Sequence, residues 1–200
     1  MIKCIIFDIG KVLIDFDFRH ASAVIAEDAG TTPDELEAFL LKQNIFPKLD
    51  AGIITVDDLI EMLRKKYGLE MPLEEIKRVW CSIFTGETPG MRKLLEQTGE
   101  KYELACLSNI NHVHYEFIRD NYTVLDLFRR QFISYRMKLA KPDPAIFESA
   151  LRELRYAPEE CVFIDDLPEN VSGAEKAGIR SFVFKDSRSL HRALDAAHIL

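Results

Sequence analysis

The chain has 200 residues, of which 48% are hydrophobic, and it carries a formal net charge of −7. This length and composition suit one domain, or a core with a modest insert, and exclude a chain too polar to bury a core. The acidic balance argues against nucleic acid as a partner, because the phosphate backbone attracts basic surfaces. The longest basic run is Arg64-Lys65-Lys66, which we interpret as part of a solvated helix face.

The start of the chain does not fit a secretory signal peptide, because only Lys3 is basic and the apolar run breaks at Asp8. No stretch approaches the length of a membrane span. The four cysteines are scattered and include no CxxC pair, and three of them lie in apolar, strand-like runs. These features predict a cytoplasmic protein with reduced thiols.

The chain begins with a short apolar segment, residues 4–7, that ends in Asp8 and a turn at Gly10. β-branched and aromatic residues dominate this segment, which is typical of a buried strand. Residues 16–90 then lose strand patterns and show the periodicity of amphipathic helices. This change of pattern predicts an inserted helical unit.

Start signals place three helices within the insert. Thr32-Pro33-Asp34-Glu35 supplies an N-cap, a proline at the first helical position and a capping-box glutamate. Thr55 begins a second helix that Gly68 would end, and a third is expected over residues 72–84. The aromatic residues here favour packing over ligand contacts, although Phe16 and Phe18 flank the entry to the insert. They are Phe16, Phe18, Phe39, Phe46, Trp80 and Phe84.

From residue 88 onward, helix and strand patterns alternate. Helices are expected at 91–98, 112–121, 144–154, 169–177 and 188–197, with strands at 102–107, 131–135, 161–164 and 180–184. With the first segment, five strands separated by helices predict an α/β fold with a doubly wound, Rossmann-like parallel sheet. The predicted division is a core of residues 1–15 and 91–200, and a helical cap of residues 16–90.

Polar side chains follow several of these strands. The first strand ends in Asp8, the second in Ser108-Asn109 and the fourth in Asp165-Asp166, while Lys141 lies in the connection after the third. Ligands of a doubly wound sheet bind beyond the carboxyl ends of its strands. We therefore expect acids, a hydroxyl and a lysine to converge on one crevice.

Such a set suits one kind of chemistry. Clustered carboxylates require a hard cation, and Mg²⁺ binds one or two of them together with water and a substrate phosphate. A lysine supplies positive charge for a phosphate, and a hydroxyl with neighbouring N–H groups adds donors. These are the components for phosphoryl transfer to a carboxylate, followed by hydrolysis of the aspartyl-phosphate.

Four motifs in order resemble those of the haloacid dehalogenase (HAD) superfamily. They are Phe7-Asp8-Ile9-Gly10-Lys11-Val12-Leu13, Leu107-Ser108-Asn109, Lys141-Pro142 and Phe163-Ile164-Asp165-Asp166-Leu167-Pro168-Glu169-Asn170-Val171. The insert between the first two is placed like the small cap of subclass I. Asp8-x-Gly10-x-Val12 and Ser108-Asn109-x-Asn111 are most similar to bacterial sugar-phosphate phosphatases of this superfamily, such as α-glucose-1-phosphate phosphatases.

The resemblance implies roles at the acidic positions. Asp8 would be the nucleophile and a Mg²⁺ ligand, and the backbone carbonyl of Gly10 a second ligand. Asp166 would be the third ligand, with Asp165 close to the ion or bridged to it by water. Asn170 would orient this acidic loop from the first turn of its helix.

The resemblance also implies a phosphoryl-binding set. Ser108 and Asn109 would hold the transferring group, and Lys141 would neutralise charge on it and on Asp8. His112 and His114 follow this motif at a spacing that does not put them on one helix face, so they do not predict a paired metal site.

One position departs from the pattern of typical phosphatases in this superfamily. They carry a second aspartate two residues after the nucleophile, which protonates the leaving group and then activates water. Here that residue is Gly10. The proton must then come from water, from the substrate, or from a side chain such as Asp15, Asp17 or a residue of the cap.

The predicted function is a Mg²⁺-dependent phosphatase of small phosphometabolites, with sugar phosphates favoured. Two alternatives stay open. A hydrolytic dehalogenase uses the same nucleophile on a carbon–halogen bond but needs no metal, so the Asp165-Asp166 pair argues against it. A non-catalytic member could bind a phosphorylated ligand or a partner as a regulator; Asp8 and Lys141 argue against this alternative, while Gly10 leaves it open.

Overall fold

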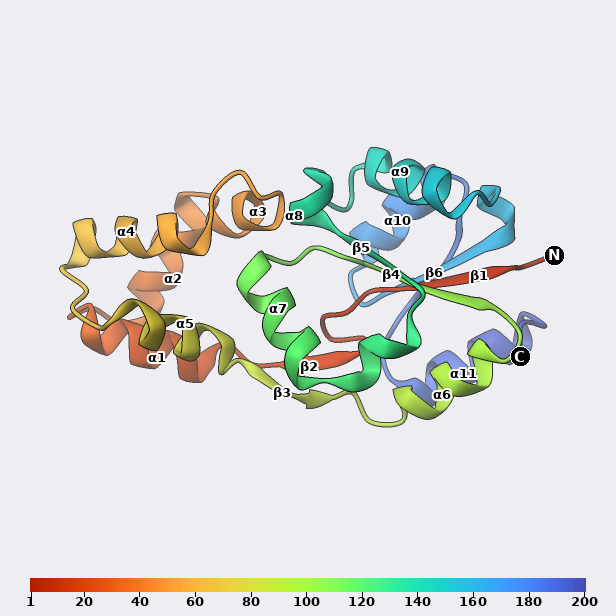
Figure 1. Cartoon of the computed structure of the whole chain (residues 1–200), viewed down its shortest axis with the longest axis horizontal. Coiled ribbons are helices and arrows are strands. Elements are labelled where there is room, and N and C mark those ends of the chain that lie inside the picture. Colours follow the sequence, from red (N-terminus) through yellow and green to blue (C-terminus); the bar gives the residue numbers. More distant parts are fainter.

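A computed structural model describes residues 1–200 as a parallel sheet flanked by helices, with a separate group of helices at one end (Figure 1). The five-stranded sheet has the order β5-β4-β1-β6-β7, and every neighbouring pair is parallel. Its strands are β1 (Cys4–Phe7), β4 (Glu103–Ser108), β5 (Arg130–Ile133), β6 (Cys161–Asp165) and β7 (Arg180–Val183). The predicted α/β fold class and the five predicted strands are confirmed.

Side-chain alternation along β1 explains the two helical layers. Ile5 and Phe7 are fully buried on one face, while Cys4 and Ile6 are fully buried on the other. The first face packs against α6 (Met91–Gly99), α7 (His112–Asn121) and α11 (Ser187–Ala196), and the second against α9 (Pro144–Leu154) and α10 (Pro168–Lys176). Two covered faces account for the continuous apolar run of this strand.

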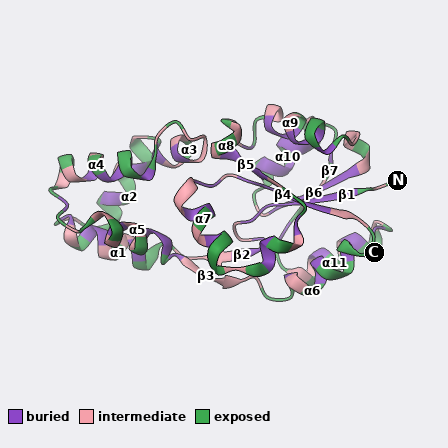
Figure 2. Cartoon of the chain, viewed as in Figure 1, coloured by how far each residue is buried: buried purple, intermediate pink, exposed green.

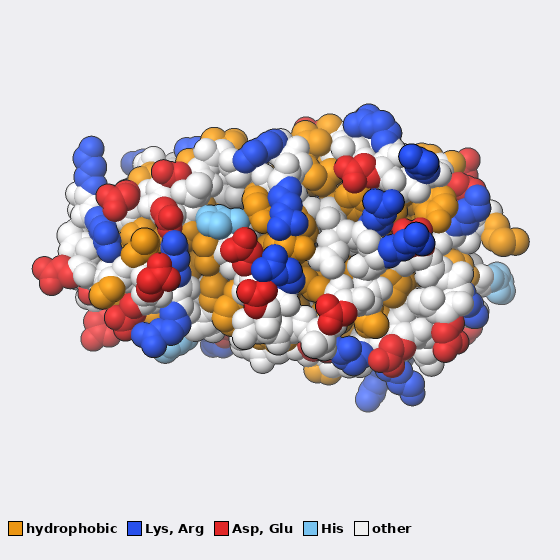
Figure 3. Space-filling view, in the orientation of Figure 1, with side chains coloured by type: hydrophobic (Ala, Val, Ile, Leu, Met, Phe, Trp, Pro, Cys, Tyr) orange, Lys and Arg blue, Asp and Glu red, His pale blue; other side chains and the backbone are white.

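Shorter elements complete the core. These are the four-residue helix α8 (Ser134–Met137) and the 3₁₀ turns η1 (Thr123–Leu127) and η2 (Pro158–Glu160). Both chain termini lie at the end of the core remote from the cap helices (Figure 1). Lysine, arginine, aspartate and glutamate side chains are interspersed over the face drawn in Figure 3. No helix is long and apolar enough to cross a membrane.

The cap helices, α1 to α5, bury their own apolar cluster, which includes Ile25, Leu40, Leu59 and Ile76. They are α1 (Arg19–Asp28), α2 (Pro33–Lys42), α3 (Ile45–Asp50), α4 (Val56–Tyr67) and α5 (Leu73–Cys81). Figure 2 shows buried residues on the inward side of these helices and exposed residues outside. The apolar faces of these amphipathic helices therefore pack against one another within the cap.

The predicted helix starts in the cap are present. The Thr32 hydroxyl accepts a hydrogen bond from the Glu35 N–H, and Thr55 forms a reciprocal capping box with Asp58. Gly68 ends α4 in the left-handed conformation that glycine adopts without steric cost.

A short antiparallel ribbon joins the cap helices to the core, and it was not predicted. Strand β2 (Ile14–Phe16) pairs with β3 (Phe84–Glu87), with an irregularity between Asp15 and Phe16. The expectation of only helices over residues 16–90 was wrong here, and α5 ends at Cys81 instead of residue 84. The sequence Phe-Thr-Gly-Glu of β3 carries too few apolar residues to signal a strand.

Candidate active site

The site lies where the strand order reverses. From β1 the chain builds one side of the sheet through β4 and β5, and then the other through β6 and β7. Phe7 pairs with Cys106 on one side and Ile164 on the other, and the Asp8 N–H donates to the Ile164 carbonyl at 2.8 Å. This register brings Asp8 to the central crevice of the sheet.

Lys141 connects two of the expected acids. Its Nζ donates to Asp8 Oδ1 at 2.8 Å and to Asp165 Oδ2 at 2.6 Å. All three side chains are buried, with only 5% of Lys141 exposed. A lysine at this depth is stable as a cation because two carboxylates compensate for its lost hydration.

These contacts set the charge states. Burial raises the pKa of Asp8 to about 6, with Asp165 adding to the rise, while Lys141 and a hydrogen bond from Ser108 oppose it. Burial alone would lower the pKa of Lys141, but the two carboxylates outweigh it and raise that pKa. The lysine is therefore charged at neutral pH, and Asp8 is ionised above a pH of about 6.

Asn109 holds the loop that carries Lys141. Its Oδ1 accepts from the Lys141 backbone N–H, and its Nδ2 donates to the Lys141 carbonyl, both at 2.8 Å. The predicted contact of Asn109 with a phosphoryl group is therefore left to its backbone N–H. The side chain instead fixes the loop that delivers Lys141, while no backbone carbonyl accepts from the N–H of Asn109.

Three carboxylates converge as the sequence predicted. Oxygen atoms of Asp8, Asp165 and Asp166 lie within 4.8 Å of one another. Burial and the nearby Asp165 raise the pKa of Asp166, as expected for neighbouring carboxylates. Such a set of hard oxygen donors fits Mg²⁺.

The two neighbouring acids differ in how many protein donors they bind. Asp165 accepts hydrogen bonds from Lys141, from the Leu167 N–H at 2.9 Å and from the Asn170 amide at 3.0 and 3.1 Å. Asp166 is half-buried and accepts none from another side chain. The Asp166 carboxylate is therefore more available to a metal ion than that of Asp165. The Gly10 carbonyl is also available, because no backbone N–H donates to it.

Phe16 occupies the space beside Gly10. A Cβ atom added to Gly10 would lie 3.0 Å from Phe16 Cε1 and 4.0 Å from Asp8 Oδ2. Strand β2 holds Phe16 there, and the Lys11 ammonium lies 4.6 Å from the centre of its ring. The aspartate that typical phosphatases carry at this position is thus replaced by an aromatic ring from the next strand.

Neither acid proposed nearby can donate a proton at neutral pH. Asp15 accepts from Lys11 Nζ at 2.6 Å, and this bond lowers its pKa. Asp17 pairs with Arg19 through both carboxylate oxygens, which lowers its pKa to about 2. Both carboxyl groups are held ionised by their neighbours.

A cavity of about 260 Å³ opens beside Gly10, Ser108 and Asn109, and most of its wall is aromatic or apolar. Phe16, Phe18, Phe46, Trp80 and Phe84 line it, whereas Phe39 packs on Tyr67 elsewhere. The predicted packing of these rings is present, since Phe18 packs on Phe16 and Phe46, and Phe46 stacks on Trp80, while five of the six also line the cavity. The only acid in the wall is Asp50, the last residue of α3.

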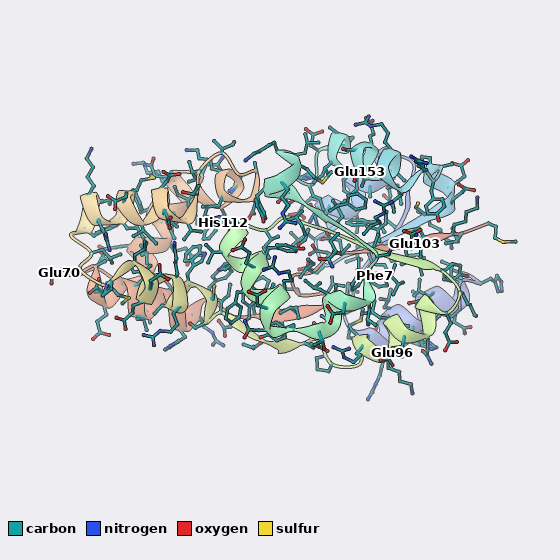
Figure 4. All side chains as sticks on the ribbon, in the orientation of Figure 1. Phe7, Glu70, Glu96, Glu103, His112 and Glu153 are labelled. Carbon is teal, nitrogen blue, oxygen red and sulfur yellow. The ribbon has the colours of Figure 1, made fainter.

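His114 forms the contact between the cavity wall and the cap. Its Nε2 lies 2.9 Å from the Trp80 carbonyl, so this nitrogen carries the proton, and its Nδ1 accepts from the Asn111 amide at 3.1 Å. Burial lowers its pKa to about 4. A neutral histidine with both nitrogens engaged is structural. His112 lies at the cap-facing end of α7 (Figure 4).

Sequence reasoning missed Asp50, Ser134 and the position of Phe46, Trp80 and Phe84 in the cavity wall. None of these residues belongs to a motif, so no spacing links them to Asp8. Asp50 has one weak signal, its position two residues before Gly52.

Comparisons with known proteins agree with this geometry. A model of the haloacid dehalogenase-like hydrolase family matches residues 2–178. A D-ribitol-5-phosphate phosphatase of Bacteroides thetaiotaomicron is 28% identical over 194 residues, which cover 91% of each chain. A sesquiterpene phosphatase of Aspergillus oryzae is 27% identical over 188 residues, covering 92% of this chain and 91% of that protein.

A solved structure is similar in fold as well. The HAD family enzyme of Bacteroides thetaiotaomicron, crystallised with magnesium and inorganic phosphate, has a TM-score of 0.78 at 27% identity, covering 94% of this chain and 96% of that one. The chain belongs to the haloacid dehalogenase-like hydrolase family. It is a hydrolase.

Proposed function

We propose that the protein is a Mg²⁺-dependent phosphatase of small phosphorylated metabolites, acting through an aspartyl-phosphate on Asp8. The observation that carries the proposal is the buried contact of Lys141 with both Asp8 and Asp165, beside a third carboxylate. A nucleophilic carboxylate, a fixed cation and a hard-metal ligand set are together what phosphoryl transfer requires.

Each side chain of the site has a separate role in phosphoryl transfer. An Asp8 oxygen attacks phosphorus, and the bond from phosphorus to the leaving oxygen breaks. Lys141 neutralises charge on Asp8 and on the transferring oxygens, while the Ser108 hydroxyl and the free N–H of Asn109 donate to those oxygens. Asn109 acts on this step through the Lys141 loop that it fixes.

The metal would be held by Asp8, the Gly10 carbonyl and Asp166, with Asp165 as a buried neighbour that fixes Lys141. Bound Mg²⁺ would supply positive charge to the phosphoryl oxygens. Asn170 positions the acidic loop through its two hydrogen bonds to Asp165. The free carboxylate of Asp166 supports its choice over Asp165.

The proposed substrates are sugar and polyol phosphates. The cavity beside the phosphoryl site holds about 260 Å³, which suits a small carbon skeleton, and aromatic walls pack well on its C–H faces. The phosphatase named for D-ribitol 5-phosphate supports this class. The earlier resemblance to α-glucose-1-phosphate phosphatases keeps that hexose phosphate in the test panel.

We further propose that residues 1–15 and 91–200 form the catalytic core and residues 16–90 a subclass I cap that selects substrate and excludes water. Cytoplasmic location and the absence of a nucleic-acid partner remain part of the proposal.

The test is a panel of phosphate esters with and without Mg²⁺, run beside 2-haloacids. We expect turnover of sugar phosphates and of an aryl phosphate, and its loss in Asp8→Asn. The matched control is Asp120→Asn, which changes an exposed acid on α7. Turnover of haloacids alone would establish the dehalogenase, and no turnover of any compound would favour the regulator.

A further inference from the structure

We infer that Asp50, on cap helix α3, is the general acid and base of the active site. The inference rests on the proposed phosphatase function. It addresses a chemical need that the core leaves open, because Gly10 has no side chain and Asp15 and Asp17 are committed to Lys11 and Arg19. The Asp50 side chain is free of such commitments.

The position of Asp50 suits the role. It is the only carboxylic acid in the wall of the cavity that Gly10, Ser108 and Asn109 also line. It lies close enough to Asp8 and Lys141 for both to act on its charge. A leaving group in this cavity, attached to phosphorus at Asp8, would therefore lie between the nucleophile and Asp50.

The backbone of Asp50 is fixed to the core. Its carbonyl accepts from Ser134 Oγ at 2.5 Å, and the same oxygen atom of Ser134 accepts from the Ile110 N–H at 3.0 Å. Ser134 is fully buried. This bridge ties the end of α3 to the loop that follows Ser108, so the acid is preorganised against the phosphoryl site.

A second contact lies two residues further on. The Gly52 carbonyl accepts from Lys138 Nζ at 2.7 Å, and Gly52 has a φ of +61°. A Cβ atom there would lie 2.8 Å from the Tyr135 carbonyl oxygen. Only glycine lets the chain after Asp50 approach the core this closely.

The protonation state of Asp50 fits an acid that must act near neutrality. Burial raises its pKa to about 7, Asp8 adds to the rise, and Lys141 opposes it. The carboxyl group makes no ion pair or hydrogen bond with a protein group. The charged or titratable groups around it are Asp8, His114, Lys138 and Lys141. Of these, His114 is neutral and Lys138 is bonded to Gly52.

The proposed steps balance. As the phosphorus–oxygen bond to the leaving group breaks, protonated Asp50 gives its proton to that oxygen and becomes a carboxylate. Water then attacks the phosphorus of the aspartyl-phosphate, and Asp50 accepts a proton from it. The bond between phosphorus and Asp8 breaks, which releases phosphate and restores both carboxyl groups.

The experiment compares leaving groups in Asp50→Asn. An aryl phosphate needs little protonation, whereas a polyol or sugar phosphate leaves as a strongly basic alkoxide. We expect kcat for the best alkyl phosphate of the panel to fall by about 10²–10⁴-fold and kcat for the aryl ester by less than about tenfold. The basic limb of the alkyl pH profile should disappear, and Asp50→Glu should restore part of the rate. Asp34→Asn, an exposed acid on α2, is the matched control.

The outcomes separate the two proposals. A wild-type protein that hydrolyses no phosphate ester overturns the proposed function and this inference with it. If the wild type is active, an equal loss on both esters, or a rise in KM with unchanged kcat, assigns Asp50 to substrate binding and overturns the inference. Thermal unfolding of Asp50→Asn establishes that the variant is folded in either case.

Discussion

The core and the cap differ in how their polar groups are satisfied. In the core, Lys141, Asp8, Asp165 and Asn170 form a buried network in which each charge has a partner. In the cap-side wall, the Asp50 carboxyl group has no such partner, and it lines a cavity together with five aromatic side chains. The core is therefore built to hold charge in place, and the cap to supply a group that changes charge during the reaction.

The largest effect is expected from breaking the core network. Lys141→Ala leaves Asp8 and Asp165 buried without their cation. Activity should fall below detection, and the free energy of unfolding should drop by about 3–5 kcal/mol because two carboxylates lose their partner. Urea titration and a phosphate-release assay measure both. Lys101→Ala, which removes an exposed lysine, should keep the fold at wild-type stability within about 1 kcal/mol. Near-wild-type turnover in Lys141→Ala would contradict the proposed role of the lysine.

The next effect concerns the metal ligands. Asp166→Ala should lower activity at limiting Mg²⁺ and recover part of it at high Mg²⁺, because one ligand is lost and the others remain. Isothermal titration with Mg²⁺ should show weaker binding. Equal Mg²⁺ affinity in variant and wild type would remove Asp166 from the ligand set.

A smaller effect is expected when an acid is placed at position 10, where it could replace Asp50 as the proton donor. Gly10→Asp should destabilise the protein by about 1–3 kcal/mol, because the new side chain meets Phe16 at 3.0 Å. Combined with Phe16→Ala, it should restore alkyl phosphate turnover to an Asp50→Asn protein. Phe16→Ala with Asp50→Asn and the original Gly10 is the control. No restoration, in a folded triple variant, would argue that an acid beside Asp8 cannot replace the one in the cap.

The smallest effect is expected at the bridge between the two regions. Ser134→Ala removes the hydroxyl shared by Asp50 and Ile110, and should lower the free energy of unfolding by about 1–3 kcal/mol. It should also reduce kcat for alkyl phosphates more than for aryl phosphates, because Asp50 is less well placed. An equal reduction in kcat for both classes of ester would mean that Ser134 stabilises the fold but does not position Asp50.

The Asp50 carboxyl group should make the stability of the protein depend on pH. The pKa of its carboxyl group is higher in the folded protein, at about 7, than its ordinary value of 3.8. Between these two values the unfolded chain binds fewer protons, so this group lowers stability as pH rises. Asp50→Asn should therefore raise the melting temperature relative to wild type at pH 8 and change it little at pH 4. A constant difference across that range would contradict the raised pKa.

Sequence patterns predicted the parts that local rules determine. Residues 4–7 and 161–164 are apolar runs ended by acids, and both are buried strands with Asp8 and Asp165-Asp166 at their ends. The capped helices α2 and α4 were found from Thr32 and Thr55. Helix α1 lacks a side-chain cap, and α3 has only six residues, so neither had a comparable signal.

The remaining site features depend on tertiary contacts. Phe16 is six residues from Gly10, yet its ring fills the place of a side chain there because β2 turns back over the nucleophile loop. Asp50 is 42 positions away from Asp8 and meets it only through the docking of α3 on Ser134. The amide of Asn109 could equally have bound phosphate, and only the structure shows it bound to the Lys141 backbone.

The most direct test of the account is to trap the intermediate. The protein is mixed with substrate and Mg²⁺, quenched, reduced with borohydride and analysed by peptide mass spectrometry. The account predicts that the aspartyl-phosphate at Asp8 is reduced to homoserine at that position, in the wild type and not in Asp8→Asn. Turnover with an unmodified Asp8, or modification of a different carboxylate, would contradict it.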